Sequence, residues 1–149
     1  MKKLIFITMP FLVAAQEPDS IKTFNANEVL ITSTRAALNT PTTFSLIKSA
    51  ELQRVNLGQD LPVMLDFSPS VVSTSDAGAG VGYTSMRIRG SDATRINVTI
   101  NGIPVNDAES HNVFWVNTPD LFSSVEDIQV QRGVGTSTNG AGAFGASVN

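Results

Sequence analysis

The chain has 149 residues, of which 42% are apolar and 15% are charged, and its formal net charge is -3. This length and composition are typical of one globular domain, and the scattered lysines and arginines give no indication of a nucleic-acid partner. The sequence contains one histidine, His111, and no cysteine. A zinc or haem site built from those ligands is therefore excluded, and we expect no protein-bound metal.

Residues 1–15 have the pattern of a cleaved secretory signal peptide. Lys2 and Lys3 provide the positive start, residues 4–13 are apolar, and small residues precede Gln16. The apolar run is far shorter than the roughly 20 residues that a helix needs to cross a bilayer. We therefore predict that the chain is exported and that the mature protein begins at Gln16.

The start of the mature chain, residues 16–35, has two parts. Residues 16–27 are polar, which predicts a mobile segment. Residues 28–35 have a high strand propensity. Such a run can pair with the edge of another protein's sheet, or it can be the first strand of the domain. The residues by themselves favour the second interpretation.

One strand and two helices are predicted next. The strand covers residues 41–47, and Ser49 has the position of an N-cap before a helix at residues 50–55. Asp60 is predicted to cap a second helix at residues 61–67. This second helix would turn one face to the core, made of Val63, Met64 and Phe67.

Residues 71–85 have the composition of a surface loop. Serine, threonine and glycine dominate the stretch, with Gly78, Gly80 and Gly82 close together. Such a segment buries little of itself and lies on the surface, where binding residues tend to occur.

Three short runs alternate apolar and polar residues, which is typical of half-buried strands. They cover residues 86–89, 96–100 and 128–131. After the second run, Asn101-Gly102 has the preferred residues for a tight turn with positive φ at both positions. Pro104 lacks the amide hydrogen that an interior strand needs, so the strand after this turn is predicted to be a short edge.

Acidic, imidazole and aromatic side chains occur together between residues 105 and 117. They are Asp107, Glu109, His111, Phe114 and Trp115. General acid–base catalysis would also need a defined pocket and a third orienting group. We therefore predict no catalytic residue, and we interpret Phe114 and Trp115 as packing residues or as part of a ligand-facing loop.

A last helix is predicted to start at Thr118-Pro119-Asp120. Threonine is a common N-cap, proline fits the first helical position, and an acidic residue there is favoured by the helix dipole. Its buried face would consist of Leu121, Phe122 and Val125.

Five segments of the mature chain follow one another in a recognisable order: residues 28–35, 86–90, 98–106, 125–133 and 140–148. In series they resemble the plug domain of TonB-dependent outer-membrane receptors, of the siderophore or iron-complex type. The resemblance implies an α+β fold with a small mixed sheet, short helices and long loops over residues 36–149. It also implies a surrounding barrel of about 22 strands, for which the printed chain has no sequence. We therefore expect a plug without its barrel.

The resemblance implies a gating domain of an active transporter, and no enzyme, with a ferric siderophore or similar iron chelate as substrate. No cofactor is expected, because the iron would be carried within the substrate. The implied partners are the chelate, the receptor's own barrel, and TonB with its inner-membrane energising complex. The implied location is the outer membrane of a Gram-negative bacterium, with the plug inside the barrel and facing the periplasm. The alternative is a free-standing periplasmic binding or adhesion module with a plug-like fold.

The resemblance also implies roles for particular residues. The TonB box, which would leave the plug and pair with TonB, would consist of Glu28, Val29, Leu30, Ile31, Thr32 and Ser33. Arg89 and Arg132 match arginines that pair with barrel carboxylates, although ordinary strand-end charges are an equally good interpretation. The small residues of 133–146 would let the plug approach the barrel wall. The substrate-facing loops would contribute Ser75, Asp76, Tyr83, Asp107, Glu109, His111, Phe114 and Trp115.

Overall fold

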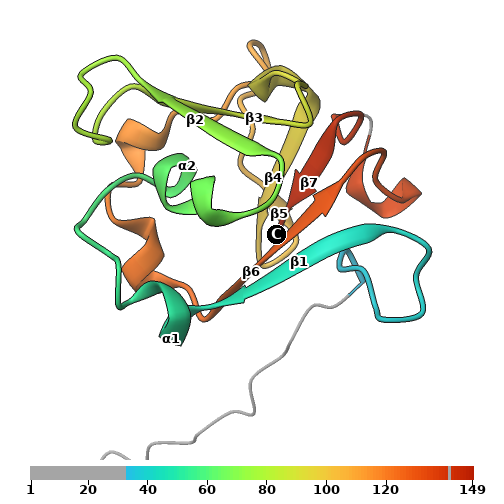
Figure 1. The fold of residues 1–149 in the computed structure, drawn as a ribbon. Coiled ribbons are helices and arrows are strands. Elements are labelled where there is room, and N and C mark those ends of the chain that lie inside the picture. Colours follow the sequence, from blue (N-terminus) through green and yellow to red (C-terminus); the bar gives the residue numbers. More distant parts are fainter. Residues whose placement is uncertain (1–32, 141) are drawn as a thin grey trace, which may run out of the picture.

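The computed structural model describes residues 33–140 and 142–149, which form an α+β domain (Figure 1). A five-stranded mixed sheet lies beside a two-stranded sheet, and short helices connect the strands, which confirms the expected fold class. The predicted signal peptide and residues 28–32 of the predicted TonB box lie outside the described residues. Within the described part, no helix is long and apolar enough to cross a bilayer.

The strand that comes last in the sequence, β7 (Ala146–Val148), lies in the middle of the larger sheet. Its order is β1 (Thr43–Lys48), β6 (Asp127–Arg132), β7 (Ala146–Val148), β4 (Ile96–Ile100) and β5 (Ile103–Pro104). Strand β7 runs parallel to β4 and antiparallel to β6. Because β7 separates β4 from β6, the sheet is complete only when the end of the chain has inserted. The alternation pattern did not predict β7, which has only three residues.

The tight turn between β4 and β5 is confirmed. Asn101 has φ 50° and Gly102 has φ 81°, the positive values that a two-residue hairpin turn of this hand requires. The strand that follows has two residues, which confirms the predicted short edge. The predicted strands at residues 41–47 and 128–131 are also confirmed, each with ends shifted by one or two residues.

The second sheet corrects the prediction of a loop over residues 71–85. Strand β2 (Val71–Ser75) pairs antiparallel with β3 (Thr84–Ile88), so only residues 76–83 form the connection. Val71 and Thr84 are both buried. The serine- and threonine-rich strand is stabilised by its pairing with β3, a tertiary contact that composition does not reveal.

The predicted helices form, but they are shorter and begin differently. The first is α1 (Ser49–Leu52), in which Ser49 is the first helical residue and Lys48 has the cap position. The second is a turn of α-helix, α2 (Leu61–Met64), followed by the 3₁₀ turn η1 (Leu65–Phe67). Because the helix tightens into η1, the side chain of Phe67 is 75% exposed, and its predicted place in the core was wrong.

The predicted helix after Thr118 begins later than expected. Thr118 ends the 3₁₀ turn η3 (Trp115–Asn117), and Asp120, with φ 48°, precedes the next 3₁₀ turn, η4 (Leu121–Ser124). The buried face was predicted correctly, because Phe122 is buried and Leu121 and Val125 pack against the core. Two further 3₁₀ turns are η2 (Ala93–Arg95) and η5 (Ser137–Asn139).

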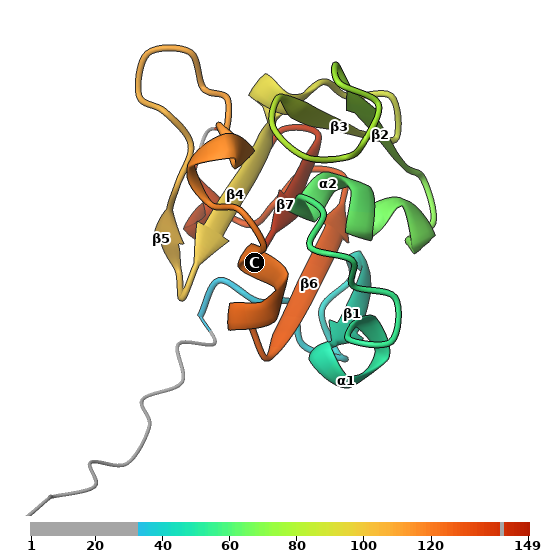
Figure 2. The ribbon, with the colours of Figure 1, turned by 90° about the vertical axis from the view of Figure 1, so that its left-hand side faces the viewer.

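The apolar core lies on one face of the five-stranded sheet. Figure 2 shows α2 and η4 in front of this face, with the β2–β3 sheet above them. In β6, Ile128 and Val130 belong to the core, so Gln129 and Gln131 point to the opposite face. Both glutamines are nevertheless buried. The core consists of Leu61, Met64, Leu65, Val71, Met86, Ile88, Ile96, Val98, Trp115, Phe122, Ile128, Val130, Ala146 and Val148.

Candidate functional site

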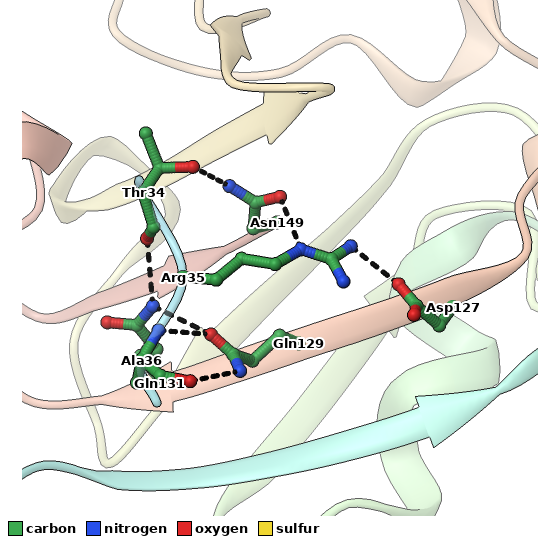
Figure 3. Close-up of polar contacts among 7 residues, drawn as sticks. All are labelled: Thr34, Arg35, Ala36, Asp127, Gln129, Gln131 and Asn149. Atoms are coloured by element: carbon green, nitrogen blue, oxygen red, sulfur yellow. Dashed lines mark hydrogen bonds and ion pairs between the residues drawn. The ribbon is translucent and has the colours of Figure 1, made fainter. Parts of the chain in front are cut away.

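The first described residues cross the opposite face of the sheet, where they bind the side chain of Gln129. The backbone amide of Ala36 donates to Oε1 of Gln129 at 2.7 Å, and Nε2 of Gln129 donates to the carbonyl of Ala36 at 2.9 Å (Figure 3). One glutamine amide thus satisfies both backbone groups of Ala36, as a neighbouring strand would. Residues 33–36 themselves belong to no strand.

Gln131 and Asn149 extend this binding to Thr34. Nε2 of Gln131 donates to the carbonyl of Thr34 at 3.1 Å and to Oε1 of Gln129 at 2.9 Å. Nδ2 of Asn149 donates to Oγ1 of Thr34. Asn149 is itself held by two backbone hydrogen bonds to Gln129, of 2.7 and 2.9 Å, which continue the β6–β7 pairing by one residue.

Arg35 completes the network with a charged contact. Its Nη2 atom lies 2.5 Å from Oδ1 of Asp127, and its Nε atom donates to Oδ1 of Asn149 at 3.2 Å. The Arg35 and Asp127 side chains are 20% and 33% exposed, so the ion pair is only partly screened by water. We call this network the N-terminal clasp; its members are Thr34, Arg35, Ala36, Asp127, Gln129, Gln131 and Asn149.

The sequence by itself did not reveal the clasp residues on β6 and at Asn149. A polar residue at every second position of a strand usually faces water, so Gln129 and Gln131 looked like solvent-facing positions. Residues 34 and 36, more than ninety positions away in the chain, provide backbone partners for both glutamines, and Asn139 donates to Oε1 of Gln131.

Arg89 and Arg132, predicted to meet barrel carboxylates, lie close to each other. Arg89 follows β3 in the left-handed region, with φ 51°, and its Nη1 donates to the carbonyl of Arg132 at 3.2 Å. Nη1 of Arg132 donates to Oγ of Ser45 at 2.7 Å. Burial and then the nearby charge of Arg89 lower the pKa of Arg132. Among the described residues, neither arginine forms an ion pair with a carboxylate.

The connection of residues 76–83 carries two predicted substrate-facing residues, Asp76 and Tyr83, and a third, Ser75, ends β2 just before it. Asp76 and Tyr83 are exposed, and the amide of Asp76 donates to the carbonyl of Tyr83 at 3.1 Å. Ser75 is half-buried, and its Oγ accepts from the amide of Gly80 at 3.1 Å. The two exposed side chains are therefore free to contact a ligand, whereas Ser75 shapes the loop.

Asp60 ties the same loop to α2. Its amide donates to the carbonyl of Gly80 at 2.8 Å, and its Oδ2 accepts from Oγ1 of Thr84 at 2.9 Å. Asp60 has the N-cap position, but its side chain makes no hydrogen bond to the helix, so the predicted capping role was wrong. The carboxylate is turned instead to β3, because Thr84 offers a hydroxyl inside the fold.

The segment of residues 107–115 folds around the carboxylate of Asp107. This carboxylate accepts from the amide and hydroxyl of Ser110, at 2.7 and 2.8 Å, and from the amide of Glu109. Hydrogen bonds from Ser110, first from its amide and then from its hydroxyl, lower the pKa of Asp107. The carboxylate is thus engaged in shaping the turn. His111, with φ 58°, donates its amide to the carbonyl of Asp107 at 2.9 Å.

Asn106 fastens this turn to β4. Its Oδ1 accepts from the amide of Val98 at 2.7 Å, and its Nδ2 donates to the carbonyls of Ile96 and His111, both at 2.9 Å. Asn106 thereby joins the β4 edge to the tip of the turn. Asn106 ends the segment of residues 98–106, one of the five that resemble the plug family, but the sequence indicated no role for it.

The two aromatic residues of this segment differ in burial. Phe114 is 46% exposed, whereas Trp115 is 3% exposed and belongs to the core. Trp115 is therefore a packing residue, and its prediction as a substrate-facing residue was wrong. Glu109 and His111 are exposed. Among the described residues, no three acidic or histidine side chains lie close enough to hold a metal ion.

The two predicted substrate loops lie toward one end of the domain. Both Figure 1 and Figure 2 place residues 76–83 and 107–112 in the upper part of the domain, and the first described residues in the lower half. The exposed side chains of these loops and the N-terminal clasp are thus on different parts of the surface of the domain.

Comparison with known proteins identifies the family to which this domain belongs. The chain belongs to the TonB-dependent receptor plug domain family, whose sequence model matches residues 36–147. Plug domains of these receptors are components of transporters and are not enzymes. A comparison with curated protein sequences found no significant match.

Two solved structures of similar fold are siderophore receptors. The siderophore receptor PirA from Acinetobacter baumannii is 23% identical, with a TM-score of 0.52 over 71% of this chain and 16% of that one. The ferric enterobactin receptor PfeA, in complex with BCV-L6, is 24% identical, with a TM-score of 0.53 over 71% of this chain and 17% of that one. The chain thus spans a small fraction of either receptor, and the likeness shows a common fold.

Proposed function

We propose that this chain is the plug, or gating domain, of a TonB-dependent outer-membrane transporter for ferric siderophores or a similar iron chelate. The observation that carries the proposal is the family match over residues 36–147, which includes all of the larger sheet except Val148. Both similar structures are receptors named for siderophores or for ferric enterobactin, which supports an iron chelate as the substrate class. The iron would enter with the substrate, and the plug would need no cofactor of its own.

Residues 28–33 would act as the TonB box and pair as an added strand with TonB in the periplasm. TonB and its inner-membrane energising complex would then pull on the chain just before Thr34. Two observations support this order of events. The clasp holds the residues that directly follow the proposed box, and it lies away from the two exposed loops.

Arg89 and Arg132 would meet carboxylates of the surrounding barrel. The support is electrostatic, because two guanidinium groups lie close together without a carboxylate partner in the described part of the chain. Like charges held together are unfavourable until an opposite charge approaches. The alternative is that both arginines are ordinary charged residues at strand ends, which normally face water. This alternative fits Arg89 better than Arg132, since Arg132 is partly buried.

The chelate would contact the exposed side chains at the tips of the two loops. These are Asp76, Tyr83, Asp107, Glu109, His111 and Phe114. An aromatic and polar mixture on two loops suits recognition of a ligand that carries both aromatic and oxygen-rich groups. The barrel's own loops would supply the rest of the site.

The proposal is tested by iron uptake in cells that depend on this receptor. Uptake would be measured with radioactive iron supplied as a panel of ferric chelates, including ferric enterobactin. Ile31→Pro should abolish uptake, because proline cannot donate the backbone hydrogen bond that strand pairing requires. Binding of the same chelate to the cell surface should persist. Ile21→Pro, in the polar segment before the box, is the matched control and should leave uptake unchanged.

Uptake by Ile31→Pro at the wild-type rate would overturn the TonB-box assignment. The alternative of a free-standing binding or adhesion module is tested separately, by reading the gene beyond the codon for Asn149. Alternating amphipathic segments of about ten residues there would support a receptor with its own barrel. A stop codon at that position would favour the free-standing module.

A further inference from the structure

Strand β7 is shorter than the two strands between which it lies (Figure 2). Its last residue, Val148, is in register with Val98 on β4 and with Val130 on β6. Beyond that point β4 continues to Ile100, and in the same direction β6 extends back to Asp127. Because neighbouring strands are about 4.8 Å apart, β4 and β6 are separated there by about 10 Å, which is room for one further strand. We call this space the β7 gap.

A cavity of about 340 Å³ lies in the β7 gap. Its lining includes residues of both bordering strands and of the end of β7, namely Thr99, Ile100, Asp127, Ile128, Val148 and Asn149. Leu61 of α2 and Leu121 of η4 also line it, and both belong to the core or pack against it. The cavity is therefore apolar on the side of the core.

The β4 edge of the gap presents polar groups at Thr99. The amide of Val98 donates to Asn106 and its carbonyl accepts from Val105, so the backbone groups of Val98 point to β5. Backbone groups alternate in direction along a strand, and the carbonyl of Thr99 therefore points into the gap. Oγ1 of Thr99 is buried without a hydrogen-bond partner among the described residues. Since buried polar groups usually have partners, this edge has the chemistry of one that another segment covers.

The β6 edge presents backbone groups in the same way. Gln129 and Asn149 exchange two backbone hydrogen bonds, of 2.7 and 2.9 Å, so Gln129 points to β7. By the alternation of an antiparallel ladder, the amide and the carbonyl of Asp127 are the next groups on this side. A small apolar molecule in the gap would leave these groups without partners, whereas an extended main chain would satisfy them.

The alternation of side chains in β7 predicts which residues fit the gap. Val148 belongs to the apolar core, and Asn149 points to the opposite face, where it donates to Thr34. The next residue of the same strand would point to the core again, toward Leu121 and Ile128. The one after it would lie on the face of Asn149. A segment that fits therefore begins with an apolar residue and continues with a polar one.

We propose that the β7 gap is filled by the residues that follow Asn149 in the receptor, which extend β7 by two residues and complete the sheet. The inference rests on the proposed function, in which the plug is one part of a receptor; the chain spans 16% and 17% of the two similar receptors. The connection to the rest of the receptor is then part of the folded sheet at its start, and it is not a free linker.

The first test adds three residues to the end of the full chain. Ile-Thr-Ile should raise the urea midpoint of unfolding by about 1 M, because its first isoleucine becomes buried against the core. Thr-Ile-Thr is the matched control with the alternation reversed. It should leave the midpoint nearly unchanged, since its isoleucine would lie on the polar face.

Amide hydrogen exchange gives a local measurement on the same chains. With Ile-Thr-Ile added, the amide of Asp127 should exchange about ten-fold more slowly, because it gains a hydrogen-bond partner in the gap. The amide of Ser110, in the turn around Asp107, should keep its rate.

A substitution locates the effect within the gap. Leu121 lines its core side, so the gain in midpoint from Ile-Thr-Ile should fall by about half in Leu121→Ala. Val72→Ala is the control, at an exposed position on β2, and it should leave the gain unchanged.

The gene beyond the codon for Asn149 provides an independent check. It should encode an apolar residue first and a polar residue second. A charged residue at the first of these positions would overturn the inference, since that position faces the core.

Equal midpoints for the Ile-Thr-Ile and Thr-Ile-Thr chains would also overturn it. So would a shift of the same size when the free, end-capped tripeptide Ile-Thr-Ile is added at about 1 mM to the unextended chain, because the gap would then take a strand from another molecule. A stop codon after Asn149 would overturn both this inference and the transport proposal. Loss of the dependence on alternation would overturn this inference alone, and failure of iron uptake would leave it standing.

Discussion

Arg35 and Asp127 form an ion pair in which Nη2 lies 2.5 Å from Oδ1, and it joins the start of the described chain to the start of β6. The two residues are separated by most of the domain in sequence. The contact forms only when the segment before β1 crosses the face of the sheet opposite to the apolar core. The pair thus couples the proposed pulling point directly to a central strand of the sheet.

The stability effect of this pair should be modest and salt-dependent. Asp127→Asn should lower the free energy of unfolding by about 0.5 to 1 kcal/mol, because both side chains retain contact with water. Urea denaturation at low and at high salt measures the effect, which should shrink at high salt. Asp92→Asn, which affects the more exposed pair, should have a smaller effect. A loss several times larger would mean that the ion pair belongs to the core's cooperative unit.

The corrected position of Phe67 gives a second prediction. Phe122→Ala should lower the free energy of unfolding by about 3 to 5 kcal/mol, because Phe122 is 1% exposed and its loss leaves a cavity. Phe67→Ala should be nearly neutral, since that side chain is 75% exposed. Chemical denaturation of the two variants provides the comparison. Similar losses would contradict the observed end of η1.

Asn106 should be essential for the position of the loop that follows it. Asn106→Ala removes three hydrogen bonds, and it should lower the free energy of unfolding by about 2 kcal/mol. It should also speed amide exchange at Ser110 more than at Gln129. The control is Asn117→Ala, at an exposed position after the same loop. Unchanged exchange at Ser110 would show that Asp107 holds the turn alone.

The pKa of Asp107 predicts how the turn responds to acid. Hydrogen bonds from Ser110 hold this pKa below the ordinary value of 3.8. Because the folded-state pKa is lowered, the carboxylate stabilises the turn at neutral pH, and this contribution is lost as the pH falls through the lowered pKa. An NMR titration of Asp107 measures its pKa in the folded protein. Ser110→Ala should raise the pKa toward 3.8, whereas Ser123→Ala should leave it unchanged.

Local sequence signals predicted the elements whose conformation depends on neighbouring residues. Asn101-Gly102 predicted its turn, because few other residues accept positive φ at both positions. The alternation of residues 96–100 and 128–131 predicted two strands, since side chains on a strand alternate between its faces. The segments in series were also sufficient to indicate the plug family, which the family match confirms.

Burial and pairing were decided by the tertiary structure. The sequence distinguished the two faces of β6. It did not reveal that Gln129 and Gln131 are buried, because the residues that bind them, 34–36, lie far away in the chain. Composition likewise predicted a loop at Val71–Ser75, which becomes a strand because β3 pairs with it. The fully buried β7 lies between β4 and β6 although it has only three residues. Periodicity and turn chemistry act over a few residues, whereas burial depends on which distant segments meet.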